Sequence, residues 1–249
     1  MSNGALPEIV AALTSQPHWR IVIRPSRYQQ ELIPSLSDCM KILRRTSVRL
    51  RGWDFPQLGP DHDMQLGKNF VGFASSIIGL EYWRFYQSGQ FVHLQTLDEI
   101  FARDQLEEAA RYQLSRFPEH RAVDWSKVPG FISIINFLYT MTEIFEFTAR
   151  LCLAGVYCEN CVIEIALKDI KGFILTMEPP RRFPKYCKAT ADTLEHSWTI
   201  PSNVLITDGA DKALEAVKWF FERFGWNDPN IDSLRADQQQ FLRLAESAP

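Results

Sequence analysis

Residues 81–94 read EYWRFYQSGQFVHL and decide the fold, because they predict a β-hairpin with aromatic side chains on both faces. Ser88–Gly89 can form a two-residue turn, since glycine adopts the positive φ that tight hairpin turns require. Side chains alternate between the two faces along each strand. The predicted core face comprises Trp83, Phe85, Val92 and Leu94. The predicted outer face comprises Tyr82, Arg84, Tyr86, Phe91 and His93.

Two further alternating segments extend this outer face. WRIVIRP (19–25) is rich in β-branched residues and SVRLRGW (47–53) alternates, and each segment places its arginines on one face. If these strands join the sheet of the hairpin, one face gathers cationic and aromatic side chains. The predicted binding residues on it are Arg20, Arg24, Arg49, Arg51, Trp53, Arg84, Tyr86 and His93.

The charge of this region agrees with a binding face. Residues 18–93 carry ten Lys or Arg and six Asp or Glu, although the whole chain has a net charge of −3. Arginine presents a planar fork to phosphate, and aromatic rings can stack on bases. We therefore expect a binding module for nucleic acid or another anionic partner, or for a protein partner. The alternative is a solvated sheet face on which arginine stems cover aromatic edges.

The remaining chain alternates between strand-like and helix-like segments. Residues 131–153 form a helix that is apolar almost all round and is therefore buried, and amphipathic helices follow at 209–224 and 232–246. Segments within 161–177 and 196–201 read as further strands. This order predicts an α+β fold, in which a mostly antiparallel sheet packs with a long buried helix and C-terminal helices. We expect a single domain over residues 1–249, with a subdomain break within 118–130 as the alternative.

Composition and cysteine usage indicate a cytoplasmic protein. The chain is 46% hydrophobic over 249 residues, enough for a sizeable core, and no apolar run is long enough for a membrane span. The N-terminus lacks the basic and apolar regions of a signal peptide. Five scattered cysteines, an odd number, fit free thiols in a reducing compartment.

Catalytic motifs are not evident. The sequence contains no G-x-S-x-G, no G-x-x-x-x-G-K-[ST] and no G-x-G-x-x-G. Glu143 and Glu146 lie in the apolar helix, where a carboxylate can act as a general base. We expect instead a buried ion pair, with an arginine from the sheet as its partner, because a buried carboxylate needs a counter-charge. We expect a non-enzymatic protein. The alternative is an enzyme that uses Glu143, Glu146 and His93 in one pocket.

A metal site is the second alternative. Cys158 and Cys161 form a C-x-x-C pair, and with Cys187 and His196 they supply four ligands of the types that bind tetrahedral zinc. The spacing between Cys187 and His196 is longer than in a compact zinc motif. We expect no cofactor, and we expect Cys161 to be a small buried residue at the start of a strand.

Residues 128–177 resemble a region of some bacterial Schlafen-like proteins. The segment runs from VPG through a long helix and ARLCLAGV to CVIEIALKDIKGFILTM. This order is similar to the accessory region that follows the AlbA-type putative nucleic-acid-binding domain in those proteins. The glycine- and glutamate-bearing motif of the AlbA-type domain is absent. The resemblance implies a bacterial accessory or sensing module and assigns no catalytic residue.

Overall fold

A seven-stranded antiparallel sheet is the centre of the structure. The computed structural model describes residues 5–77, 79–97, 99, 102–115, 117, 120, 123–177, 183 and 185–246. The strands follow the order β2-β3-β4-β5-β1-β7-β9. Their bounds are β1 His18–Pro25, β2 Gln65–Leu66, β3 Phe70–Ser75, β4 Glu81–Tyr86, β5 Phe91–Thr96, β7 Asn160–Lys168 and β9 Leu194–Pro201. The predicted α+β fold with a mostly antiparallel sheet is confirmed.

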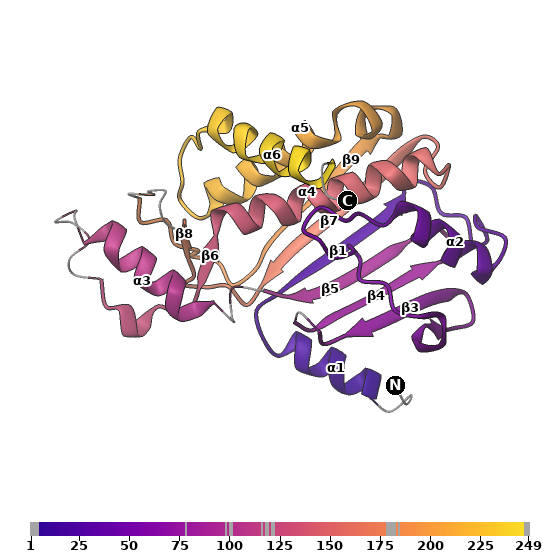
Figure 1. Ribbon diagram of the computed structural model, residues 1–249, viewed down its shortest axis with the longest axis horizontal. Helices are drawn as coiled ribbons and strands as arrows, with labels where there is room; N and C mark the ends of the chain where they lie inside the picture. Colours follow the sequence, from indigo (N-terminus) through magenta and orange to yellow (C-terminus); the bar gives the residue numbers. More distant parts are fainter. Residues whose placement is uncertain are drawn as a thin grey trace.

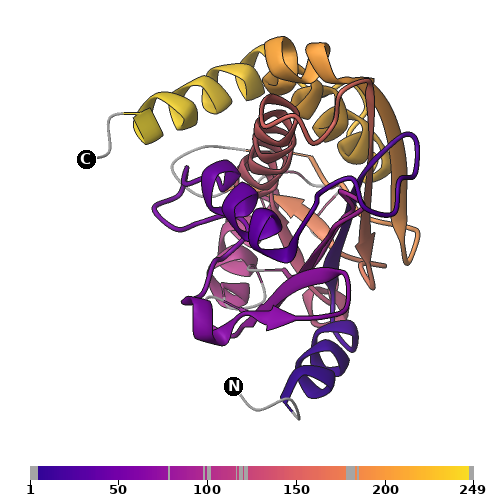
Figure 2. The same cartoon turned by 90° about the vertical axis from the view of Figure 1, so that its right-hand side faces the viewer.

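Helices cover one face of the sheet, and the sheet curls around them (Figures 1 and 2). We call this face concave and the opposite face convex. Helix α4 runs along the concave face with α5 and α6 above it, whereas α1 packs against the convex face. The helices are α1 Ala5–Thr14, α2 Leu36–Thr46, α3 Arg103–Leu114, α4 Ile134–Leu153, α5 Ser202–Arg223 and α6 Ile231–Glu246. The long buried helix and the C-terminal helices are therefore as predicted.

Helix α4 is buried because nearly its whole surface is apolar. Phe137 on α4 packs against Trp19 of β1 and Phe220 of α5, with ring centroids 4.9 and 5.5 Å away. The helix begins three residues later than predicted, since the Ser133 side chain caps it by accepting from the backbone N–H of Asn136. Residues 131–133 instead form β6 (Phe131–Ser133), which pairs in parallel with β8 (Ile174–Thr176) in a separate small sheet.

The β4–β5 hairpin has a turn one residue longer than predicted. The N–H of Tyr86 donates to the carbonyl of Gln90, and Gly89 has a φ of +79°. The loop therefore has three residues, and the cross-strand pairing shifts by one position. A one-residue shift moves every side chain of a strand to the other face. Phe91 and His93 consequently lie on the concave face, so their predicted place on the outer face is wrong, whereas β4 alternates as predicted.

The segment 47–53 is not a strand of the sheet. Its backbone contributes one isolated bridge, between Val48 and Phe55, and Gly52 turns the chain with a φ of +88°. The loop crosses near α4 on the concave side. The prediction that it extends the binding face with Arg49, Arg51 and Trp53 is therefore wrong.

The structure describes only part of the region in which the alternative subdomain break was predicted. The alternative subdomain break at 118–130 falls partly on residues 118, 119, 121 and 122, which are outside the described residues. Next to them Val128 packs with Leu106 and Ile174 in a small cluster apart from the main core. Among the described helices, none combines the length and apolar character needed to span a membrane.

We predict that Trp83→Ala lowers the free energy of unfolding by about 3–5 kcal/mol. Trp83 is fully buried on the concave face, and its indole N–H donates to the carbonyl of Gln57 at 2.8 Å. The substitution therefore removes a large packed side chain and leaves that carbonyl without its donor. Urea denaturation followed by circular dichroism measures the change.

Tyr28→Ala is the matched control, because Tyr28 is an aromatic residue that is 78% exposed. We expect it to change the unfolding free energy by less than about 0.5 kcal/mol. Equal effects of the two substitutions would contradict the assignment of Trp83 to the core.

Candidate functional site

The convex face carries four of the predicted binding residues. Arg20 and Arg24 extend from β1, and Arg84 and Tyr86 extend from β4, because strand register places them opposite convex-face neighbours. Arg84 pairs with Gly72 on one side and Val92 on the other. Half-exposed arginines and aromatic side chains therefore share a surface, although it is smaller than predicted.

Arg84 lies among aromatic rings. Its guanidinium carbon is 4.3 Å from the ring centroid of Phe70 and 5.3 Å from that of Tyr82. Phe70 also contacts Tyr86, its cross-strand partner, with centroids 5.4 Å apart. We call these four residues, Phe70, Tyr82, Arg84 and Tyr86, the Arg84 stack. Burial raises the pKa of the Tyr82 hydroxyl, whereas the nearby guanidinium opposes that rise.

Gly72 makes room for the Arg84 side chain. A Cβ atom on Gly72 would lie 2.9 Å from the carbonyl oxygen of Trp83 and 3.3 Å from Cγ of Arg84. Gln65 on β2 occupies the next position in the same cross-strand row. Gln65 Oε1 and Arg84 Nε are both buried without a hydrogen-bond partner. An acceptor and a donor thus lie beneath the surface of this site without a described partner.

The arginines of β1 differ from Arg84 in their partners. Arg24 contacts Glu164 at 2.9 Å, and Arg20 lies 3.6 Å from Glu195. Arg84 has no carboxylate partner among the residues that the structure describes. The positive charge of the convex face is therefore least compensated at the Arg84 stack.

Arg51 leaves this face and binds a buried carboxylate on α4. Its guanidinium donates to both oxygens of Glu143, to Asn136 Oδ1 at 2.6 Å and to Thr140 Oγ1 at 3.3 Å. The Glu143 side chain is 0% exposed and that of Arg51 only 8%. Trp53 covers Arg51 with its ring 5.4 Å away. The predicted ion pair of Glu143 is confirmed, but its arginine comes from a loop and not from the sheet.

His93 is also committed to an interior partner. Its Nε2 lies 2.8 Å from Glu81 Oε1, which also accepts from the backbone N–H of Gln57. The rings of Phe55 and Phe91 flank the imidazole, and His93 is 0% exposed. His93 therefore cannot contact a ligand on the convex face.

The three residues of the enzyme alternative lie in three separate interactions. Glu143 binds Arg51, His93 binds Glu81, and Glu146 forms a half-buried pair with Arg150 at 2.9 Å. The geometry therefore does not assemble them around a shared substrate.

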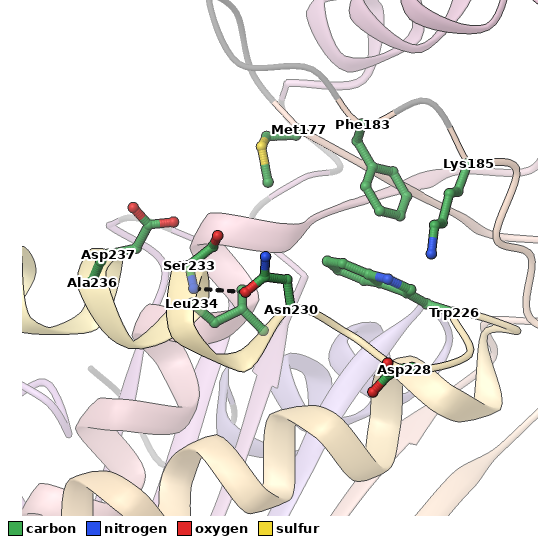
Figure 3. Close-up of a pocket in the computed structure, with 10 residues that line it drawn as sticks. All are labelled: Met177, Phe183, Lys185, Trp226, Asp228, Asn230, Ser233, Leu234, Ala236 and Asp237. Atoms are coloured by element: carbon green, nitrogen blue, oxygen red, sulfur yellow. Dashed lines mark hydrogen bonds between the residues drawn. The ribbon is translucent and has the colours of Figure 1, made fainter.

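A cavity with a volume of about 600 Å³ opens between α6 and the segment that follows β8 (Figure 3). Met177, Phe183, Trp226 and Leu234 give it an apolar wall, with Lys185 beside the Trp226 ring. None of the residues of the enzyme alternative lines it. Ser233 and Asp237 of α6 add polar groups to its wall.

The candidate zinc ligands do not come together. Within the described part of the chain, no group of three or more His, Cys, Asp or Glu side chains is placed to hold a metal ion. Cys158 is exposed, Cys161 and Cys187 are buried, and His196 stacks on Trp219 of α5. Cys161 opens strand β7 as a small buried residue, as predicted.

The site around the Arg84 stack includes three residues that sequence reasoning missed, Phe70, Gly72 and Gln65. Phe70 and Gly72 begin the strand FVGFAS, and Gln65 lies in a segment read as a loop. The available signal was the alternation of FVGFAS, which puts Phe70, Gly72 and Ala74 on one face. Whether this face is the convex or the concave one depends on how β3 pairs with β4, and that pairing cannot be predicted from the local sequence.

We predict that Glu143→Ala destabilises the protein by about 3–5 kcal/mol, because it leaves the buried Arg51 guanidinium without its counter-charge. Glu146→Ala is the matched control on the same helix. It removes a half-buried i,i+4 pair, which should cost no more than about 0.5 kcal/mol. Chemical denaturation measures both values, and a similar loss for the two variants would contradict the buried-pair assignment.

We predict that one thiol of the native protein reacts quickly with a thiol reagent at pH 8 and that five react after unfolding. Burial raises the pKa of Cys39 to about 12 and those of Cys152 and Cys187 to about 11. Burial also raises the pKa of Cys161. These thiols stay protonated at pH 8 and unreactive, whereas Cys158 is exposed. Fewer than five thiols after unfolding without reductant would indicate a disulfide.

Comparisons with known proteins give no relative for this chain. No protein-family model matches it, no curated protein matches it significantly, and no solved structure matches it significantly. The resemblance of residues 128–177 to Schlafen-like accessory regions therefore stays a prediction.

Proposed function

We propose that this protein is a non-enzymatic binding module that binds single-stranded nucleic acid on its convex sheet face, around the Arg84 stack. One observation carries the proposal. Arg84 is held between Phe70 and Tyr82 on a half-exposed sheet face, and no described carboxylate neutralises it.

The uncompensated guanidinium favours an anionic ligand. Arginine binds phosphate through paired N–H donors in a fixed plane. Two ring contacts hold the Arg84 side chain in place, so little conformational freedom is lost on binding.

The aromatic rings favour single strands over duplexes. Tyr86 and Phe70 lie side by side on the same face as Arg84. Unpaired bases can stack on such rings, whereas the bases of a duplex are already stacked on one another. Arg20 and Arg24 lie further along the face and keep half-exposed side chains despite their glutamate partners. They can add weaker contacts to the backbone of a longer strand.

An accessory role in a bacterial cytoplasm is the setting that fits this proposal. The odd number of free cysteines favours a reducing compartment. The resemblance of residues 128–177 to accessory regions of bacterial Schlafen-like proteins also supports it. Glu143, Glu146 and His93 are each committed to another partner, which favours binding over catalysis.

We predict that a fluorescently labelled single-stranded oligonucleotide binds at low salt and that its affinity falls as salt rises, because phosphate contacts release counterions. Arg84→Gln should weaken binding and reduce the salt slope by about one contact. Tyr86→Ala should cost about 1–3 kcal/mol of binding free energy if a base stacks there. Fluorescence anisotropy at several salt concentrations measures both.

Arg49→Gln is the matched control, since Arg49 is an exposed arginine in the loop on the concave side and its removal changes the net charge equally. We expect it to leave affinity and salt slope almost unchanged. The proposal fails if the wild-type protein does not bind at low salt. It also fails if the Arg49 and Arg84 variants weaken binding equally, because general positive charge would then explain the affinity.

A further inference from the structure

The two edges of the seven-stranded sheet are unequal. Strand β2 closes one edge with only two residues. Strand β9 forms the other edge with eight residues, and it stands at the border of the sheet in Figure 2. Short strands, lysines, prolines and bulges are the usual protection of an edge. Strand β9 contains no lysine, its pairing with β7 runs without a bulge, and its proline stands at its end.

The register shows which backbone groups of β9 are unpaired. The N–H of Ser202 donates to the carbonyl of Glu159, just beyond the last pair of the β7–β9 ladder. Hydrogen-bonding direction alternates along an antiparallel strand. Ile200, Trp198 and His196 therefore point their backbone groups toward β7. The outward N–H and C=O groups belong to Glu195, Ser197 and Thr199.

These outward groups have no backbone partner in the described part of the chain. The backbone hydrogen bonds outside the ladders include none to Glu195, Ser197 or Thr199. The side chains of the three residues are exposed on the convex face. A free row of three donors and three acceptors therefore runs along the seam, which is the arrangement that an added strand completes.

We propose that β9 pairs antiparallel with β9 of a second copy of this chain about a two-fold axis at Ser197, so that two seven-stranded sheets become continuous. In this register Glu195 lies opposite Thr199 of the other copy, and Ser197 lies opposite Ser197. All three outward N–H groups then find carbonyls. No like charges oppose each other, which is a requirement for a self-complementary strand pair.

The concave side of the seam supports the same partner. Here Trp198 would face His196 of the second copy, and both side chains are only partly buried in one copy. Trp219 of α5 stacks on His196 with centroids 4.5 Å apart, and Arg223 covers Trp219 at 4.0 Å. Burial, with a smaller contribution from Arg223, lowers the pKa of His196, so its ring is neutral at neutral pH. The seam thus offers neutral aromatic surface that pairing would bury.

Sedimentation velocity over a concentration series tests the proposal on the full chain. We expect a species of twice 28.8 kDa that grows with concentration. Ser197→Pro removes an outward N–H, without breaking a bond to β7, and should leave only monomer. Ser197→Ala is the matched control and should keep the dimer. A wild-type protein that stays monomeric, or a Ser197→Pro variant that still dimerises, would overturn the proposal.

A second variant decides the matter if Ser197→Pro does not fold. In a Cys158→Ser background, which removes the exposed native thiol, Ser197→Cys should form a disulfide-linked or reagent-linked dimer across the axis. Ser233→Cys in the same background is the control, since Ser233 is exposed on α6 away from the seam. Absence of a link through position 197, or equal linking at 233, rules out this interface. Neither result depends on nucleic-acid binding.

Discussion

The buried charge of Glu143 is the constraint on which the rest of the structure depends. It lies in the middle of α4, the apolar helix around which the sheet curls, and an unpaired carboxylate there would be strongly destabilising. Arg51 supplies the counter-charge, with Asn136 and Thr140 completing its hydrogen bonds. The loop that carries Arg51 is thereby fixed against the helix. The same loop leads to Phe55 and Gln57, which pack over His93 and Trp83.

The two faces of the sheet differ in how their charged side chains are paired. Buried charged groups on the concave side are paired, as the Glu81–His93 and Arg51–Glu143 pairs show. The convex side keeps charges that are half-exposed and, at Arg84, without a described carboxylate. The buried ion pairs that stabilise the fold thus lie on the concave side, and the uncompensated charge of Arg84 lies on the opposite face of the same strands.

The curvature of the sheet protects its concave face but leaves its two edges open. A sheet that wraps a helix protects its concave face but still ends in two edges, and only a closed barrel removes them. Here the β2 edge is short, whereas the β9 edge presents a complete row of backbone groups. If two copies join there, their convex faces become one surface that carries two Arg84 stacks. A longer anionic strand could then contact both.

Alternation and apolar runs determined the elements. The strands around WRIVIRP and FVGFAS, the buried helix and the α+β class follow from local periodicity and burial, which depend on neighbours in the sequence. Only the tertiary structure decided which side chains lie on the concave face and which lie on the convex face. The β4–β5 turn has three residues instead of the predicted two, and this places His93 on the concave face. Arg51 lies in a loop instead of the sheet, where it forms the ion pair that the buried Glu143 carboxylate requires. Register and long-range ion pairing join residues far apart in the chain, so no local pattern specifies them.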